Sequence, residues 1–278
     1  METAITLNEI KALREGLPEP VGLVPTMGYL HDGHLSLVRR ARAECASVVV
    51  SIFVNPTQFS PQEDLEAYPR DLPRDFRLLG EVGADLVWMP TPVIMYPPGY
   101  QTWVNVEDIT RLLEGARRPT HFRGVTTVVA KLLNNVQPQK AYFGQKDAQQ
   151  AIVIRRMVKD LDFPLEVVIC PIVRETDGLA MSSRNVYLTP QERQAATVLF
   201  SALQAAQKAF ESGKREADSL RKLVEEVVQS EPLASLQYVS CADPETLQEL
   251  SGSVEHGLLS MAVFFGKTRL IDNIILGG

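Results

Sequence analysis

Two histidines three positions apart, His31 and His34, are the residues of this sequence best suited to chemistry on a phosphate. They follow the short apolar run 21–24, which is typical of a buried parallel strand, and precede apolar residues at helical spacing from residue 35 to residue 43. This order predicts that both rings lie at the N-terminus of a helix, where backbone N–H groups and the helix dipole favour anions. An imidazole there can donate a hydrogen bond to a phosphate or accept a proton as negative charge builds, so we predict a nucleotide phosphate site.

Two glycines, and two polar residues after the next predicted strand, extend this site. Gly28 and Gly33 permit backbone conformations that other residues resist and let a ligand approach the main chain. Asn55 and Gln58 come directly after the β-branched run 48–54, at the carboxyl edge where open α/β sheets bind ligands. An ordinary turn explains Asn55 and Gln58 equally well, and the sequence leaves both interpretations open.

Three further groups are candidates for phosphate or substrate contacts. In the basic stretch 117–124, Arg123 is the candidate for an electropositive rim, although a solvated turn before a helix explains that stretch too. Lys146 and Asp147 follow the strand-like run 140–143 and repeat the strand, glycine and helix order, and Gln150 lies one turn further on. Ser182, Ser183 and Arg184 follow a turn and can fold over a triphosphate, but Ser-Ser-Arg is common.

Strand and helix patterns alternate through the first part of the chain and predict a doubly wound, parallel α/β sheet. Predicted strands lie at 4–5, 21–24, 48–54, 85–89, 140–143 and 165–170, and predicted helices at 6–16, 35–46, 76–82 and 125–133 and after residue 147. Residues 63–74 are expected to form a surface loop or lid. From residue 189 a long helix to 211, a helix at 216–230 and strands at 236–240, 258–265 and 270–276 predict a smaller α+β domain. The predicted domains are 1–174, which is Rossmann-like, and 175–278.

Composition excludes several classes of function. The 278 residues carry a formal charge of −6, which argues against a nucleic-acid surface. The start lacks a signal peptide, and the sequence has no apolar run near the ~20 residues of a membrane span, so a cytoplasmic location is expected. Cys45, Cys170 and Cys241 stand far apart and are predicted to be buried hydrophobes in a reducing compartment. His31 and His34 lack the spacing and partners of a zinc motif, so no protein metal site is predicted.

Several motifs, in order, resemble the pantoate-β-alanine ligase (pantothenate synthetase) family. His-Asp-Gly-His resembles the His-x-Gly-His signature of the nucleotidylyltransferase superfamily, and Met-Ser-Ser-Arg resembles the second signature loop of class I aminoacyl-tRNA synthetases. The ligase motifs are residues 25–28, 55–59, 68–70, 121–125, 143–150 and 178–185, which together span nearly the whole chain. Tyr29 stands where a small residue is usual in the family.

The resemblance implies a two-step reaction. Pantoate attacks ATP to give pantoyl adenylate and pyrophosphate, and the amine of β-alanine then displaces AMP to form pantothenate. ATP with Mg²⁺ is implied as substrate, with no tightly bound prosthetic group, and the implied assembly is a homodimer without nucleic-acid or membrane partners. Residues 175–278 would close over the site as a lid.

The resemblance also implies roles for individual residues. His34, His31, Lys146 and Arg184 would be catalytic, and Gln58 would contact pantoate and β-alanine. Gln150 would contact pantoate, and Asn55 and Arg123 are further substrate candidates. The implied ATP-binding residues are Met27, Gly28, Tyr29, Leu30, His31, Asp32, Gly33, His34, Gly144, Gln145, Lys146, Asp147, Val173, Met181, Ser182, Ser183 and Arg184.

Three rival functions remain at this stage. A nucleotidylyltransferase acting on a phosphorylated acceptor would share His-x-Gly-His, but its pocket should need more basic residues than Gln58 and Gln150 supply. An RNA-linked synthetase relative would need a basic surface, which the net charge disfavours. A nucleotide sensor would bind ATP and turn nothing over.

Overall fold

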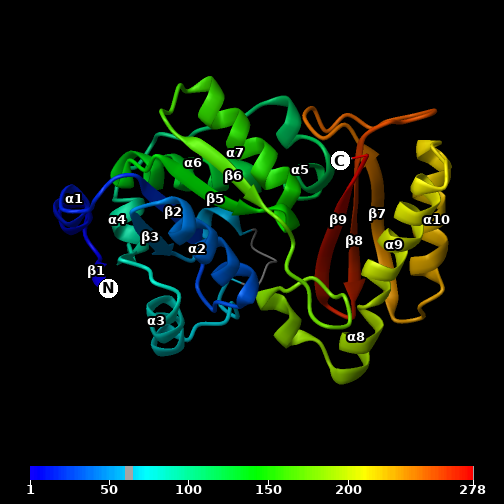
Figure 1. The fold of residues 1–278 in the computed structure, drawn as a ribbon, viewed down its shortest axis with the longest axis horizontal. Coiled ribbons are helices and arrows are strands. Elements are labelled where there is room, and N and C mark those ends of the chain that lie inside the picture. The colour runs from blue at the N-terminus through cyan, green and yellow to red at the C-terminus, as the bar shows by residue number, and fades with distance from the viewer. Residues whose placement is uncertain (60–64, 278) are drawn as a thin grey trace. The chain divides into compact units, whose positions relative to one another are not determined.

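The computed structural model describes residues 1–59 and 65–277, and the chain divides into two compact units (Figure 1). Unit 1 comprises Met1–Gly144 and Gln150–Pro171, and unit 2 comprises Gln145–Gln149 and the chain from Ile172 onward. Glu63 and Asp64 of the predicted loop at 63–74 lie outside the described residues.

The sheet of unit 1 has six strands, and every pairing in it is parallel. The strands are β1 (Glu2–Ala4), β2 (Val21–Thr26), β3 (Ser47–Ile52), β4 (Leu86–Trp88), β5 (Lys140–Gly144) and β6 (Glu166–Cys170), in the order β1-β4-β3-β2-β5-β6. This confirms the prediction of a parallel α/β sheet. Strands buried on both faces explain why their sequences are continuous apolar runs.

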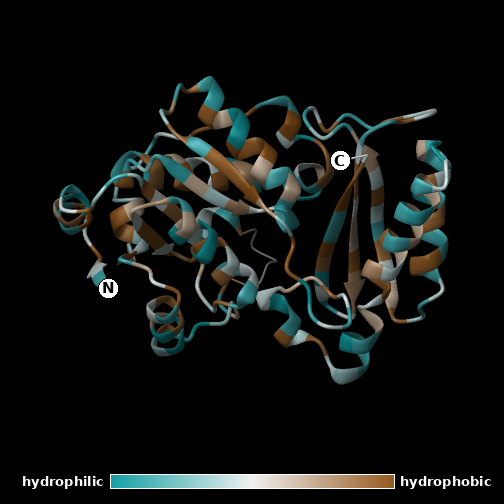
Figure 2. Cartoon of the chain, in the orientation of Figure 1, coloured by the Kyte–Doolittle hydropathy of each residue, from teal (hydrophilic) through white to brown (hydrophobic). Residues whose placement is uncertain are grey.

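Helices cover both faces of this sheet. The described helices of unit 1 are α1 (Leu7–Glu15), α2 (Asp32–Glu44), α3 (Leu72–Glu81), α4 (Pro92–Met95), α5 (Leu113–Arg117), α6 (His121–Val136) and α7 (Ala148–Asp160), with the 3₁₀ helices η1 (Pro56–Gln58) and η2 (Asp108–Thr110). One apolar core joins α2 and α3 to the sheet, and a second joins α1, α6 and α7 to its other face. The sheet is therefore doubly wound, and its strands are mainly apolar in Figure 2.

The winding direction changes between β2 and β5, at the middle of the sheet. The chain runs outward from β2 through β3 to β4 with α2 and α3 on one face, and then from β5 to β6 with α6 and α7 on the other. β2 pairs with β3 over six residues but with β5 only through Gly22–Lys140 and Leu23–Ala141. A topological switch point of this kind is where open α/β sheets bind ligands, and the histidine segment follows β2 directly.

Several boundaries differ from those predicted. Helix α2 begins at Asp32 and not at residue 35, because His31 caps it. Helix α3 begins at Leu72 and not at residue 76, because Asp71 accepts a hydrogen bond from the backbone N–H of Arg74 and caps it. The short helices α4 and α5 were not predicted.

Unit 2 packs two helices on one face of a three-stranded antiparallel sheet. Its elements are η3 (Gln145–Asp147), η4 (Ser183–Tyr187), α8 (Pro190–Ala195), α9 (Val198–Glu211), α10 (Ala217–Gln229), β7 (Ala234–Ala242), β8 (Gly257–Phe265) and β9 (Thr268–Leu276). The predicted α+β character is confirmed. The single long helix predicted from 189 to 211 is wrong, because the chain breaks at Ala196 and Thr197 into α8 and α9.

All three cysteines are buried thiols, as predicted. In the part of the chain that the structure describes, we find no helix with both the length and the apolar character needed to cross a membrane.

A polar network fixes the C-terminal end of α2 to β5. Glu44 accepts hydrogen bonds from Tyr142 at 3.0 Å and from Lys140 at 3.1 Å, and it also pairs with Arg40. The Tyr142 hydroxyl lies 3.3 Å from the Cys45 thiol, and burial raises the pKa of Tyr142. Hydrogen bonds from Arg40 and then Lys140 lower the pKa of Glu44 from 4.5 to about 2. The network therefore needs Glu44 ionised.

We predict that Glu44→Gln makes the free energy of unfolding depend less on pH in the acid range. A carboxylate whose pKa is lowered in the folded protein stabilises it above pH 4.5 and loses that contribution as the pH falls towards 2. Urea unfolding at a series of pH values should show a smaller loss of unfolding free energy across this window in Glu44→Gln than in the wild type. Lys140→Met, which keeps the carboxylate, should be intermediate. Parallel curves for wild type and Glu44→Gln would contradict the assignment.

Candidate active site

The two histidines cap helix α2 with their side chains. The His31 Nδ1 accepts a hydrogen bond from the Gly33 backbone N–H at 3.1 Å, and the His34 Nδ1 accepts one from the His31 N–H at 3.4 Å. This is a reciprocal cap in which imidazoles take the place of the usual serine and glutamate. Asp32 and Gly33, predicted to lie in a loop, form the first turn of the helix.

This cap settles which nitrogen of each ring carries the proton. Because Nδ1 accepts from a backbone N–H in both His31 and His34, the proton of each neutral ring lies on Nε2. The ring centroids are 4.0 Å apart, so two imidazolium charges would repel strongly and at least one neutral ring is favoured. Each neutral ring thus carries an Nε2–H group at the positive end of a helix.

The turn before these histidines has an unusual backbone. Gly28 has φ +82° and Tyr29 has φ +50°, so two consecutive residues adopt the left-handed region. A Cβ at Gly28 would lie 3.0 Å from the Ile52 Cγ2, so a side chain there would force its neighbours to shift in addition to the backbone strain. A left-handed conformation is unfavourable for any residue with a Cβ, so the backbone of Tyr29 is strained.

Asn55 forms the centre of a buried hydrogen-bond network at the end of β3. Its Nδ2 donates to Gln58 Oε1 and to the Gly124 carbonyl, each at 3.1 Å, and its Oδ1 accepts from the Tyr96 hydroxyl at 2.9 Å. Oδ1 also accepts from Thr57. Burial raises the pKa of Tyr96 to about 12, so its hydroxyl remains a donor. Asn55 is only 1% exposed, and its carboxamide organises this turn.

The network fixes the orientation of the Gln58 amide. Since Oε1 accepts from Asn55, the NH₂ group points the other way and lies 3.1 Å from the Met27 sulfur. Gln58 therefore presents donors beside the segment that carries the histidines. Of the residues predicted in unit 1, the structure brings together Met27, Asn55 and Gln58 through direct contacts.

The basic stretch at 117–124 supports Gln58 through its backbone. His121 Nδ1 lies 2.8 Å and Arg118 Nη2 lies 3.3 Å from the Gln58 carbonyl oxygen. Gly124 permits the close approach of α6, because a Cβ there would lie 2.4 Å from the Thr57 carbonyl oxygen. The predicted Arg123 instead stacks over Trp103 at 4.9 Å. The contacts of Arg118 and His121 with Gln58 were not predicted.

Unit 2 contains the predicted lysine turn. Asn273 on β9 donates from Nδ2 to the carbonyls of Gln145 and Lys146, both at 3.0 Å, and Gln145 Nε2 donates back to Asn273 Oδ1 at 3.3 Å. Asn273 is 3% exposed, so this clamp is shielded from water. It fixes the backbone of Lys146 and leaves the side chain to extend, while Asp147 is exposed. No local signal in the sequence pointed to Asn273.

The serine-arginine loop belongs to the same unit. Val173 O accepts from the Met181 N–H at 3.0 Å, and Ser182 caps η4 through the Arg184 N–H at 3.2 Å. Ser183 is buried. Arg174 steadies the preceding turn through two hydrogen bonds to the buried Asp272, at 2.6 and 2.9 Å.

The remaining predicted residues lie at the end of β5. Gly144 is its last residue, and Gln150 lies in the first turn of α7, partly buried.

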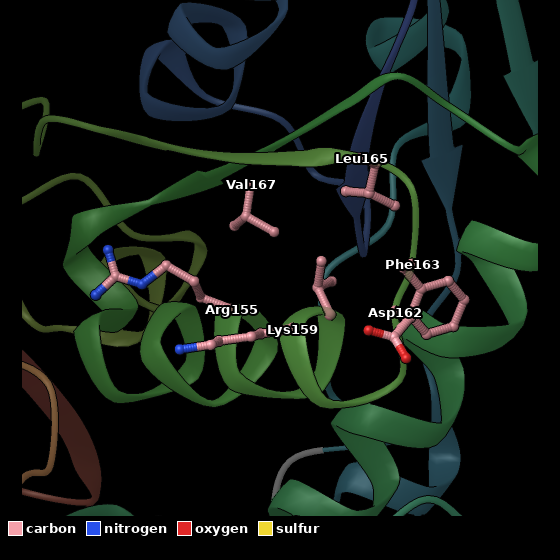
Figure 3. Close-up of a pocket in the computed structure, with 7 residues that line it drawn as sticks. Arg155, Lys159, Asp162, Phe163, Leu165 and Val167 are labelled. Carbon is pink, nitrogen blue, oxygen red and sulfur yellow. The ribbon is translucent and has the colours of Figure 1, made fainter.

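A pocket of about 430 Å³ lies elsewhere on unit 1, between the last turns of α7 and the start of β6 (Figure 3). Figure 3 shows it lined by Arg155, Lys159, Asp162, Phe163, Leu165 and Val167, all outside the predicted site. Within residues 1–59 and 65–277, no three His, Cys, Asp or Glu side chains form a set that could hold a metal ion.

Fold and site define an α/β protein whose parallel sheet carries a histidine-capped helix beside its topological switch point. Comparison with known proteins narrows this class. The family model described as pantoate-beta-alanine ligase matches residues 2–275, so the chain belongs to the pantoate-β-alanine ligase family.

Relatives of this family are similar over almost their whole length. The pantothenate synthetases of Roseiflexus castenholzii and Herpetosiphon aurantiacus are 60% and 57% identical, over 99% of this chain and 99% and 100% of theirs. The crystal structure of pantothenate synthetase from Thermus thermophilus is 52% identical with a TM-score of 0.94, covering 99% of both chains. The ligase from Francisella tularensis, complexed with beta-gamma ATP and beta-alanine, is 34% identical with a TM-score of 0.82, covering 99% of this chain and 97% of that one.

Proposed function

We propose that this chain forms pantothenate in two steps through a pantoyl adenylate. The overall reaction follows from membership of the ligase family over residues 2–275. The chain is an ATP-dependent ligase that joins pantoate to β-alanine. In the first step a pantoate carboxylate oxygen bonds to the α-phosphorus of ATP and pyrophosphate leaves. In the second the β-alanine amine attacks the acyl carbon, AMP leaves with the bridging oxygen, and the nitrogen loses a proton.

His34 and His31 are assigned to the leaving pyrophosphate. In-line transfer at phosphorus asks mainly for positioning and for donors aimed at charge that develops in the transition state. The capping geometry supports this role, because it directs both Nε2–H groups away from the helix backbone that their Nδ1 atoms bind. The other residues from Met27 to Gly33 would line the nucleotide site.

The nucleotide contacts of unit 2 are part of the same proposal. Lys146 would supply a mobile positive charge to the phosphates, and the clamp of Asn273 on its carbonyl supports a defined position. Arg184 would stabilise the transferring phosphate. Gly144, Gln145, Asp147, Val173, Met181, Ser182 and Ser183 complete the proposed ATP-binding set. Mg²⁺ would enter as MgATP, bound by phosphate oxygens. The assignment of 1–174 to nucleotide binding and of 175–278 to a lid stays a prediction.

Pantoate is assigned to Gln58 and Gln150. The Gln58 NH₂ points away from Asn55, so it can donate to a carboxylate or hydroxyl oxygen of pantoate, and Gln58 would also border the β-alanine site. Asn55 acts in this proposal by orienting Gln58, and Arg123 remains a candidate contact at the rim. We also infer a homodimer in the cytoplasm, from the family resemblance and from three thiols suited to a reducing compartment.

Product analysis with pantoate labelled with oxygen-18 in its carboxylate tests this function. With MgATP and β-alanine, we expect one labelled oxygen in AMP, one retained in the amide carbonyl of pantothenate, and none in pyrophosphate. Label in inorganic phosphate would indicate an acyl phosphate and contradict the adenylate route. A dinucleotide product with a phosphorylated acceptor would favour a nucleotidylyltransferase, and ATP binding without any turnover would favour a sensor.

His34→Ala should slow adenylate formation by about 10²–10³-fold, the usual cost of removing one donor aimed at transition-state charge. Pantoate-dependent exchange of labelled pyrophosphate into ATP measures this step without β-alanine. His256→Ala, which changes an exposed histidine of unit 2, is the matched control and should retain wild-type exchange. Equal rates for His34→Ala and the wild type would remove His34 from the chemistry.

Gln150→Ala should raise the KM for pantoate by about tenfold or more, since a hydrogen bond to a charged group contributes about 1.5–3 kcal/mol. The KM for ATP should change little. Gln150→Glu should be worse than Gln150→Ala, because it places a second negative charge against the pantoate carboxylate. Steady-state kinetics with each substrate varied in turn gives both constants. Equal losses for pantoate and ATP would count against this assignment.

A further inference from the structure

A buried carboxylate far along the chain holds the turn that precedes the histidines. Asp75 on α3 is 1% exposed, and its two oxygens accept from consecutive backbone N–H groups of the turn. Oδ2 lies 2.7 Å from the Tyr29 nitrogen, and Oδ1 lies 2.8 Å from the Leu30 nitrogen. Gly28 also contributes, because a Cβ there would lie 3.2 Å from Oδ2.

The neighbouring residue on α3 binds the same turn from its other side. Arg74 Nη1 donates to the Leu30 carbonyl at 2.8 Å, and its guanidinium lies 5.5 Å from the centre of the Tyr29 ring. Leu30 thus has its N–H bound by Asp75 and its C=O bound by Arg74. Two adjacent side chains of α3 therefore bind both backbone polar groups of one residue, Leu30.

Only an ionised carboxylate can do this with both oxygens. Burial raises the pKa of Asp75, while the hydrogen bonds from Leu30 and Tyr29 oppose that shift. An amide in its place would offer one acceptor oxygen, and its NH₂ group would face the second N–H, donor against donor. The turn has a left-handed Tyr29, which is unfavourable for a side chain unless the surroundings enforce it.

We propose that Asp75 is a positioning residue, which holds the Gly28-Tyr29-Leu30 turn in its left-handed conformation and thereby places His31 and His34 for phosphate chemistry. His31 follows Leu30 directly, so any rotation of the Leu30 peptide moves the residue that caps α2. Because Asp75 occupies the N–H groups of Tyr29 and Leu30, these do not turn towards a phosphate, and the imidazoles are the donors that this segment would supply. This role rests on the proposed function.

Asp75→Asn tests the proposal by changing one atom type with little change in volume. We expect kcat for adenylate formation to fall by about 10–100-fold while the KM for ATP changes less than threefold, because the loss falls on donors that act in the transition state. Leu79→Ala is the control, since it removes a fully buried side chain of the same helix and destabilises the protein while keeping the Asp75 carboxylate. Its kcat should stay within twofold of the wild type below its melting temperature.

A spectroscopic measurement on the free protein separates positioning from loss of stability. The chain has four histidines, so the nitrogen-15 resonances of labelled imidazoles can be assigned with single variants. The wild type should show His31 and His34 with an acceptor Nδ1 and a protonated Nε2. Asp75→Asn should shift these two residues and leave His121 and His256 unchanged, whereas Leu79→Ala should leave all four unchanged.

The outcomes separate this proposal from the function on which it rests. Wild-type kcat with an unchanged imidazole spectrum in Asp75→Asn would overturn the positioning role even when the oxygen-18 experiment succeeds. The spectrum needs no substrate, so a shift confined to His31 and His34 would support the positioning of the rings even if another reaction were catalysed. If Asp75→Asn does not fold, Arg74→Ala tests the proposal by removing the hydrogen bond to the Leu30 carbonyl. It should lower kcat about 3–10-fold and shift the same two histidines, and an unchanged kcat and spectrum would overturn the proposal.

Discussion

The N-terminus of α2 depends on two imidazoles acting as caps. A helix begins with N–H groups that have no partner inside it, and a good cap stabilises it by about 1 kcal/mol. His31 and His34 use Nδ1 for backbone N–H groups, so in each neutral ring the proton lies on Nε2. Protonation of Nδ1 would remove the acceptor and break the cap. The interaction that starts the helix therefore also favours, in each neutral ring, the tautomer with its proton on Nε2.

The turn before this cap stores backbone strain that its neighbours offset. A left-handed non-glycine residue such as Tyr29 costs about 1–2 kcal/mol. A buried carboxylate is also unfavourable by itself, yet Asp75 accepts hydrogen bonds from two backbone N–H groups of this turn. The left-handed turn and the buried Asp75 carboxylate therefore stabilise each other. The strained turn and the buried charge are stable together because the two hydrogen bonds offset the desolvation of the carboxylate and hold the backbone of the turn.

Local patterns in the sequence were enough to predict the parallel α/β sheet, the smaller α+β unit and the candidate segments around His31, Gln58 and Lys146. They could not predict contacts between distant segments. Asp75 reaches Leu30 across 45 positions, and Asn273 reaches Lys146 across 127. Neither residue stands in a motif whose local geometry reveals such a partner. The start of α2 was predicted three residues late for a related reason, since histidine is not among the usual capping residues.

The environment of Gln58 suits a nucleophilic carboxylate in the proposed reaction. A guanidinium paired with both oxygens of pantoate would bind it tightly but would lower its electron density and slow its attack on phosphorus. The two nearby guanidinium groups have other contacts. Arg118 binds the backbone carbonyl of Gln58, and Arg123 stacks on Trp103. Neutral amide donors can orient the carboxylate with weaker hydrogen bonds. The buried Asn55 then matters because it turns the NH₂ group of Gln58, and not its oxygen, towards Met27, and in the proposed reaction this NH₂ group would donate to pantoate.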